Sequence, residues 1–146
     1  MRDILGHVGA WAPRAEQVAT AELLRDLAEV QAYSAWLHDG LQARLDKLHH
    51  GLAAMAKAGL PVSSIAPQGA IYLSARFDLI GKKGLTTNDG IRRLLLDEAG
   101  FAAVPFQAFG LAEENGWFRL SVGAVSEKEI GQVLPRVEAA LRKLLG

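Results

Sequence analysis

The hydrophobic pattern of this sequence changes its period once, at Pro67, and this change constrains the fold more than any other feature. Before it, the stretch from Arg14 to Ala58 contains no proline, and its apolar residues recur at the spacing of a helix face. After it, polar and apolar residues alternate in two stretches, as in strands with one buried face. We therefore predict an α+β fold, with long N-terminal helices and a small mixed or antiparallel sheet of about three to four strands covered by helices.

The helical stretch is longer than one ordinary helix of a globular protein. We predict two helices separated by a break near Arg25–Gln31, with the second helix ending before Gly59. Gly40 and Gly51 each weaken this second helix by up to about 1 kcal/mol, so we expect another element to pack closely there.

Three stretches after Pro67 have the composition of strands. Residues 68–77 and 117–122 alternate, so each strand has one apolar face and one polar face. Residues 101–106 form a third, short strand. Because Pro105 has no N–H to donate, we place this strand at an edge or an end of the sheet.

Two further helices are predicted from their start and stop signals. The first begins at a capping residue among positions 86–88 and ends at Gly100. Ser126, followed three residues later by Glu129, forms a capping-box pattern that opens the final helix. Pro135 falls inside that helix, where proline is an awkward residue that can kink the backbone.

Composition excludes several classes of partner. The 146 residues include 16 Lys and Arg against 16 Asp and Glu, so no net charge attracts nucleic acid or an anionic membrane. The absence of cysteine excludes disulfides, thiolate metal sites and a cysteine nucleophile. No apolar run approaches the roughly 20 residues of a membrane span, and a secretory signal is not evident. We therefore expect a cytoplasmic protein that binds neither nucleic acid nor membrane.

The histidines and lysines do not form a recognisable site. His49 and His50 are adjacent on a predicted helix, so their side chains point about 100° apart, and although Asp46 is near both of them, two ligands do not make a metal site. We predict no metal site. Lys82 and Lys83 lie in a glycine-flanked loop, which is interpreted as a solvated loop tip in preference to a phosphate site.

Arg119 is the strongest candidate for a binding residue. It lies in the middle of a predicted strand, between Trp117 and Ser121 on the same face, where a charge needs a partner. Two interpretations remain: Arg119 pairs with a nearby glutamate, or its guanidinium binds a ligand carboxylate through two parallel hydrogen bonds. The strand pattern alone favours the first, whereas the loop at 106–110 adds support to the second, because Gly110 lets the backbone approach a ligand.

Four blocks of sequence occur in an order that is typical of one family. They are Pro67–Leu73, Leu94–Gly100, Val104–Gly110 and Trp117–Ser121. These blocks resemble the C-terminal part of pyridoxal-phosphate-dependent aminotransferases of class I/II, in the fold-type I, aspartate-aminotransferase-like group. The family patterns are P-x-G-A-x-Y-L, a helix ending in A-G, V-P-G-x-x-F-G and F/V-R-L-S. Residues 9–19 are similar to the stretch that leads from the family's large domain into its interdomain helix.

The resemblance implies a role for one residue. Arg119 matches the family's arginine that binds the substrate α-carboxylate. Phe109 and Gly110 match the loop near the active site and receive no chemical role. Phe106 and Gln107 depart from the pattern, because the family often has Gly-Ser or a similar small pair there. The resemblance thus implies a carboxylate-binding C-terminal domain in an enzyme that transfers an amino group between an amino acid and a 2-oxo acid.

The rest of the family's active site has no match in this chain. The lysine that forms the Schiff base, the aspartate at the cofactor pyridine and the phosphate-binding residues lie upstream in the family. None of the six lysines here lies in a block resembling the lysine motif. We therefore assign no catalytic, cofactor-binding or metal-binding residue, and expect a C-terminal fragment that is inactive alone and binds no pyridoxal 5'-phosphate, which the full-length enzyme would use.

The resemblance also implies a division of the chain and its partners. Residues 1–30 would be the end of the large domain and the interdomain helix, and residues 31–146 the small domain. The expected partners are the amino acid or 2-oxo acid, the large domain and a second copy in a homodimer. Trp11, Trp36 and the alanine-rich helix from Arg14 are candidates for an apolar docking surface. The alternative is a stand-alone, non-enzymatic α+β module that binds a small carboxylate or a partner protein.

Overall fold

The computed structural model describes residue 9 and residues 12–146. Trp11 of the predicted docking surface lies outside the described residues. The chain divides into two compact units, Met1–Asp39 and Gly40–Gly146. Within the described ranges, no helix has the combination of length and apolarity needed to cross a lipid bilayer.

The first unit contains α2 (Arg14–Leu23) and the start of α3 (Leu27–Lys57). The predicted break between two helices is confirmed, and it centres on Asp26, whose carboxylate accepts the Glu29 N–H at 3.1 Å and caps α3. Every side chain of α2 is exposed, and so is Trp36 of α3, with 69% of its surface accessible.

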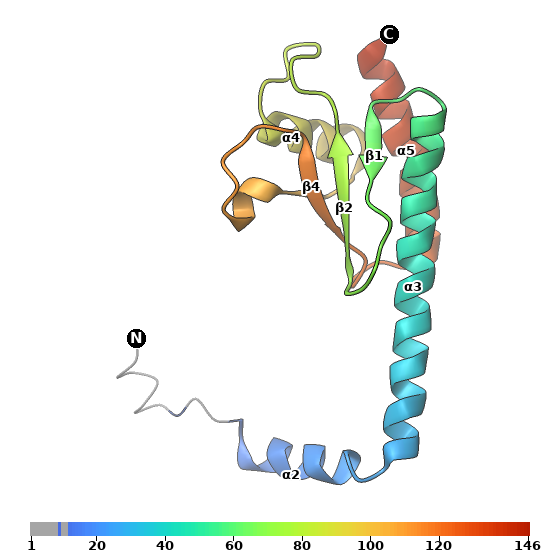
Figure 1. Ribbon diagram of the computed structural model, residues 1–146, viewed down its shortest axis with the longest axis vertical. Helices are drawn as coiled ribbons and strands as arrows, with labels where there is room; N and C mark the ends of the chain where they lie inside the picture. Colours follow the sequence, from blue (N-terminus) through green and yellow to red (C-terminus); the bar gives the residue numbers. More distant parts are fainter. Residues whose placement is uncertain (1–8, 10–11) are drawn as a thin grey trace. The chain divides into compact units, whose positions relative to one another are not determined.

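The second unit contains a four-stranded sheet in which every neighbouring pair is antiparallel. The strands lie in the order β1 (Val62–Ser64), β2 (Tyr72–Phe77), β4 (Trp117–Ser121) and β3 (Val104–Pro105) (Figure 1). The predicted α+β fold with a small sheet is therefore confirmed, including an edge position for the strand that holds Pro105.

Two details of the sheet differ from the prediction. Strand β1 was not predicted, because three residues are too few to show an alternating pattern. Strand β2 begins at Tyr72 and not at residue 68, because the preceding residues form a turn in which Ala70 has a φ of +59°.

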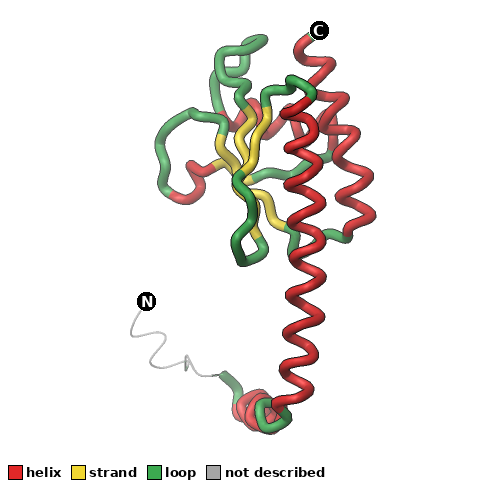
Figure 2. The backbone as a smooth tube through the Cα atoms, turned by 45° about the vertical axis from the view of Figure 1, so that its right-hand side comes forward, coloured by secondary structure: helices red, strands yellow, loops and turns green. Residues whose placement is uncertain are grey.

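One core joins the sheet to the helices of this unit. The inner face of the sheet, the C-terminal half of α3, α4 (Asn88–Ala99) and α5 (Glu127–Leu145) all contribute buried apolar side chains to it. Figure 2 shows the C-terminal half of α3 running beside α5. The two helices approach closely at Gly51, where an added Cβ would overlap the Leu134 side chain. Close packing is thus confirmed at Gly51, whereas Gly40 has only its own helix neighbour Arg44 nearby.

Local signals set the ends of α4 and α5. The Thr87 hydroxyl accepts the Gly90 N–H at 3.1 Å at the start of α4, and Gly100 ends it with a φ of +65°. The predicted capping box of Ser126 and Glu129 is present at the start of α5. These caps fix where each helix begins against the sheet.

Candidate functional site

The alternation of β4 separates its side chains onto the two faces of the sheet. Phe118 and Leu120 point inward and are buried, whereas Arg119 is partly exposed on the opposite, outer face. Arg119 pairs across the sheet with Ser74 of β2 and with Val104 of β3. It therefore has a neighbouring strand on each side, and its backbone position is set by both.

Two aromatic rings hold the Arg119 guanidinium. Its central carbon lies 4.2 Å from the ring centre of Tyr72 and 3.9 Å from that of Phe109. We call these two rings the aromatic clamp. Among the described residues, no hydrogen bond or ion pair to the Arg119 side chain is formed. The predicted pairing with a glutamate is therefore not formed, and the guanidinium N–H donors remain available.

The cation–π contacts of the aromatic clamp oppose the entropy that the Arg119 side chain loses when it is ordered. A cation–π contact at an exposed site contributes about 0.5–1 kcal/mol. Ordering an arginine side chain opposes this with about 2 kcal/mol of rotamer entropy. Two cation–π contacts together therefore roughly offset the entropy lost on ordering Arg119, whereas a single contact does not. A preorganised arginine binds a carboxylate better because less entropy is lost on binding.

The two rings of the clamp come from different elements. Tyr72 lies on β2, and its exposed ring belongs to the same outer face as Arg119. Phe109 ends the short 3-10 helix η1 (Phe106–Phe109), and Gly110 follows with a φ of +93°. The Phe106 ring stacks on Trp117 of β4 with ring centres 6.2 Å apart. The sequence pattern identified the loop, but not that both rings meet the guanidinium.

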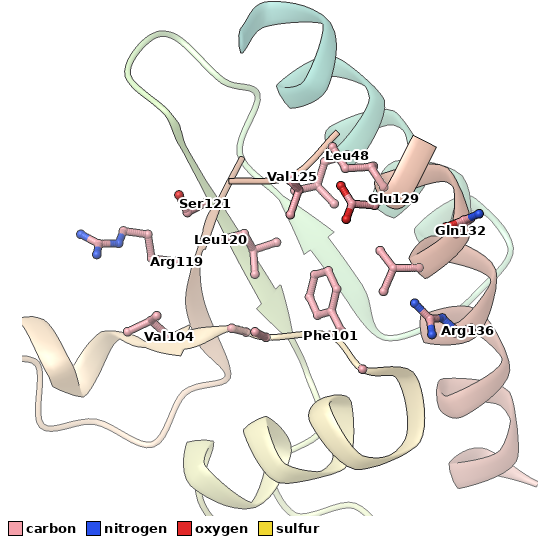
Figure 3. Close-up of a pocket in the computed structure, with 15 residues that line it drawn as sticks. Leu48, Phe101, Val104, Arg119, Leu120, Ser121, Val125, Glu129, Gln132 and Arg136 are labelled. Carbon is pink, nitrogen blue, oxygen red and sulfur yellow. The ribbon is translucent and has the colours of Figure 1, made fainter. Parts of the chain in front are cut away.

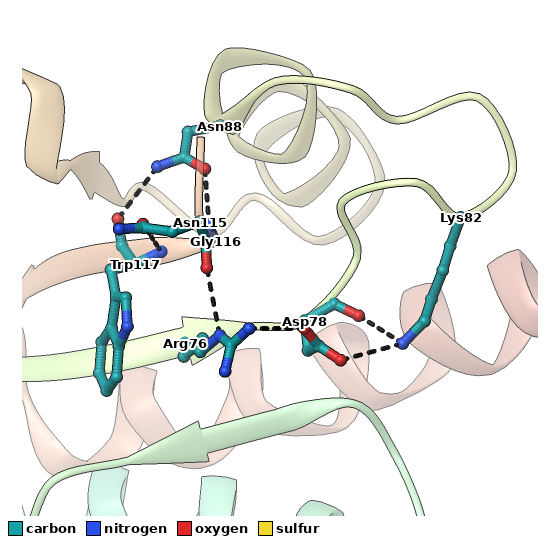
Figure 4. A network of polar contacts seen from close by, with 7 residues as sticks. All are labelled: Arg76, Asp78, Lys82, Asn88, Asn115, Gly116 and Trp117. Atoms are coloured by element: carbon teal, nitrogen blue, oxygen red, sulfur yellow. Dashed lines mark hydrogen bonds and ion pairs between the residues drawn. The ribbon is translucent and has the colours of Figure 1, made fainter. Parts of the chain in front are cut away.

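A buried amide anchors the loop that carries Phe109. The Asn88 side chain accepts the Gly116 N–H at 2.8 Å and donates to the Trp117 carbonyl at 3.4 Å (Figure 4). It also donates to the Gln107 side-chain oxygen at 2.9 Å. Sequence reasoning considered Asn88 only as a helix cap, because its partners lie far along the chain.

A second arginine on the outer face has a different environment. Arg76 of β2 forms an ion pair with Asp78 at 2.9 Å and donates to the Asn115 carbonyl at 3.1 Å (Figure 4). Asp78 also pairs with Lys82 at 3.3 Å. Arg76 is thus engaged by the protein itself, in contrast to Arg119, and serves as its matched control.

A cavity of about 570 Å³ lies on the other side of β4, toward α5. Its walls are mainly apolar and include Leu48, Phe101 and Leu120, with Glu129 and Arg136 of α5 among its polar groups (Figure 3). Arg119 borders the cavity, but its side chain points away from these two groups (Figure 3). The cavity and the aromatic clamp are therefore separate features.

The histidine and lysine predictions can be placed in the structure. His49 Nδ1 lies 2.7 Å from the Ser64 hydroxyl, and the His49 and His50 rings are 5.7 Å apart. In the described part of the chain, no group of three His, Cys, Asp or Glu residues is close enough to hold a metal ion. Lys82 is engaged by Asp78, including its carbonyl at 2.5 Å.

Comparisons with known proteins agree on one family. A family model described as aminotransferase class I and II matches residues 2–137. The aspartate aminotransferase from Rhizobium meliloti is 32% identical, with a TM-score of 0.62 over 73% of this chain and 26% of its own. The aromatic aminotransferase from Pyrococcus horikoshii OT3 is 29% identical, with a TM-score of 0.70 over 87% of this chain and 31% of its own.

A third structure shows the extent of the shared fold. The α-aminoadipate aminotransferase LysN from Thermus thermophilus, solved with N-(5'-phosphopyridoxyl)-L-leucine, is 21% identical. Its TM-score is 0.74 over 99% of this chain and 34% of its own. The chain thus spans about a quarter to a third of the length of these structures. No curated protein matches it.

Proposed function

Because the chain belongs to the aminotransferase class I and II family, we propose that Arg119 binds the α-carboxylate of an amino acid or 2-oxo acid substrate. The whole enzyme would be a pyridoxal-phosphate-dependent aminotransferase that transfers an amino group between these two substrates. In this proposal, residues 1–30 lead from the large domain, and residues 31–146 are the small, C-terminal domain.

One observation carries the proposal. The Arg119 guanidinium lies in the aromatic clamp on the outer face, with no charged partner among the described residues. Both rings lie close to its central carbon and no hydrogen bond occupies its N–H groups within the described residues, so these groups can bind a ligand. A planar carboxylate accepts two parallel hydrogen bonds from these groups.

We propose that the described residues alone do not bind the cofactor that the family uses. It needs a lysine amine that reaches the substrate bound at the arginine. The side chains that hold Arg119 are aromatic rings, which supply no amine. Lys82 is paired with Asp78, and Lys143 is paired with Glu98 at 2.7 Å. We therefore propose that the cofactor is bound elsewhere in the whole enzyme and that this chain alone is inactive.

The assembly and location of the enzyme stay predictions. A homodimer, docking of the large domain on the small one and a cytoplasmic location are all expected from the resemblance or the composition. The proposed docking surface for the large domain includes Trp36 and the exposed apolar side chains of α2.

A titration of the isotopically labelled chain tests the role of Arg119. The probe is 3-phenylpropanoate, and the NMR signals of the arginine side-chain N–H groups are followed. We expect the Arg119 signal to shift on binding, and Arg119→Gln to weaken binding by about tenfold or more, because it removes charge-assisted hydrogen bonds.

Two controls make the result specific. Arg76→Gln removes an arginine from the same face and should leave the affinity unchanged, because Arg76 is already paired. The uncharged analogue 3-phenylpropanamide should not shift the Arg119 signal. Equal binding of the amide and the carboxylate, or an equal loss of affinity in the two arginine variants, would contradict the proposal.

A further inference from the structure

Asn88 is the one buried polar side chain among the described residues, with 1% of its surface exposed. All of its side-chain hydrogen bonds lead to η1 and to the point where the following loop enters β4, through Gln107, Gly116 and Trp117. A buried amide with every donor and acceptor engaged favours one conformation of the groups that it binds. Asn88 therefore fixes both ends of the segment that connects Phe109 to Arg119.

Gln107 extends this network along the loop. Its side-chain oxygen accepts from Asn88, and its side-chain nitrogen donates to the Glu113 carbonyl at 2.7 Å and to the Glu114 carboxylate at 3.2 Å. The Glu114 carboxylate also accepts the Asn88 backbone N–H. The loop is thus closed on itself by side chains and tied to the start of α4.

Phe109 depends on this loop for its position. Phe109 is 48% exposed, so burial in the core does not hold it. Its ring meets the edge of Phe106, with centres 6.3 Å apart, and forms a cation–π contact with the Arg119 guanidinium. The conformation of the loop therefore decides whether the ring lies over the guanidinium.

We propose that Asn88 and Gln107 are positioning residues for Arg119: together they fasten the loop at 106–116 so that Phe109 stays stacked on the guanidinium. Gln107 is one of the two residues that depart from the family pattern at this loop. In this structure, its side chain links Asn88 to Glu113 and Glu114. The effect on carboxylate binding rests on the proposed function, whereas the effect on the position of the guanidinium does not.

The experiment compares Gln107→Ala with Gln132→Ala in the full chain. Gln132 is an exposed residue of α5, so its variant makes the same chemical change away from the loop. The first readout is the NMR shift of the Arg119 side-chain protons, which a ring stacked on the guanidinium moves to lower frequency. The second is the affinity for 3-phenylpropanoate, and the third is the midpoint of urea unfolding.

We expect Gln107→Ala to lose part of the ring-induced shift of Arg119 and to weaken 3-phenylpropanoate binding by about three- to tenfold, the cost of leaving one long side chain mobile before binding. The unfolding midpoint should fall only modestly, because one N–H of the buried Asn88 amide loses its partner while the bonds of Asn88 to Gly116 and Trp117 remain. Gln132→Ala should change none of the three. In the folded molecules of Asn88→Ala, the ring-induced shift of Arg119 should be lost in the same way.

The inference is overturned if the Arg119 shift survives in Gln107→Ala, or if Gln132→Ala reduces it equally. A merely structural role would lower the unfolding midpoint and leave the shift of the folded molecules intact. If the unaltered chain binds no carboxylate, the proposed function fails, and the Arg119 shift in the two variants still decides this inference.

Discussion

The two faces of the sheet are built from the same strands but hold their side chains by different means. On the inner face, Leu73, Phe118 and Leu120 are almost fully buried and lock together with the helices. On the outer face, Tyr72 and Arg119 keep access to solvent and are held by ring contacts and a loop. Alternate residues of one strand can thus separate stability from recognition.

Removing an inner-face ring should have the largest effect on this comparison. Phe118→Ala deletes a fully buried ring that lies edge-on to Phe77, with centres 5.9 Å apart, so we expect a loss of about 3–5 kcal/mol in the free energy of unfolding. Urea denaturation measures it. Ser121→Ala on the outer face of the same strand should change stability by about 0.5 kcal/mol or less. Equal losses would show that the two faces do not differ as described.

A glycine where the loop enters β4 tests how tightly the loop is joined to the sheet. A Cβ at Gly116 would overlap the Phe77 carbonyl oxygen, and the φ of Gly116 is +77°. We expect Gly116→Ala to cost more than the roughly 1–3 kcal/mol of backbone strain alone. Gly110→Ala is the matched control, because Gly110 has a φ of +93° but no atom within 4 Å. If the two variants lose the same stability in urea, the close approach contributes nothing.

The start of α5 tests whether the helices that cover the inner face depend on pH. The Ser126 backbone N–H and hydroxyl donate to Glu129 and lower the pKa of its carboxyl. Because the pKa of Glu129 is lower in the folded protein than in the unfolded chain, its ionised carboxylate stabilises the fold at pH values above the unfolded-state pKa. This stabilisation is lost as the pH falls through the folded-state pKa. We expect Ser126→Ala to cost about 1 kcal/mol at neutral pH and less in acid, because Glu129 is then protonated in both proteins. Urea unfolding of both proteins at several pH values measures this, and a constant difference would contradict it.

The smallest effects should come from the two outer-face arginines. Arg119→Gln should leave the free energy of unfolding within about 0.5 kcal/mol, because no ion pair within the described chain is lost. Arg76→Gln should cost up to about 1 kcal/mol, because it removes a partly exposed ion pair and a hydrogen bond. Thermal unfolding of both variants tests the order. A larger loss for Arg119→Gln would make Arg119 a structural residue.

Local patterns predicted most of the fold and part of the site. The alternation of β4 placed Arg119 on the outer face, and Ser126 with Glu129 marked the start of α5, because these signals act over a few residues. The aromatic clamp could not be predicted, because it depends on how β2 and η1 meet β4. The partners of Asn88 were hidden for the same reason, since they lie 19 to 29 residues away along the chain.

The short strand β3 has a consequence for how the molecule behaves at high concentration. Only Val104 and Pro105 form this edge, and the proline ring replaces the amide hydrogen that another strand would need. An incoming strand therefore finds little backbone to pair with on this side. This edge therefore disfavours the pairing of sheets from different molecules, which is a common route to aggregation. Because β3 lies between β4 and this edge, the strand that carries Arg119 is not itself open to such pairing.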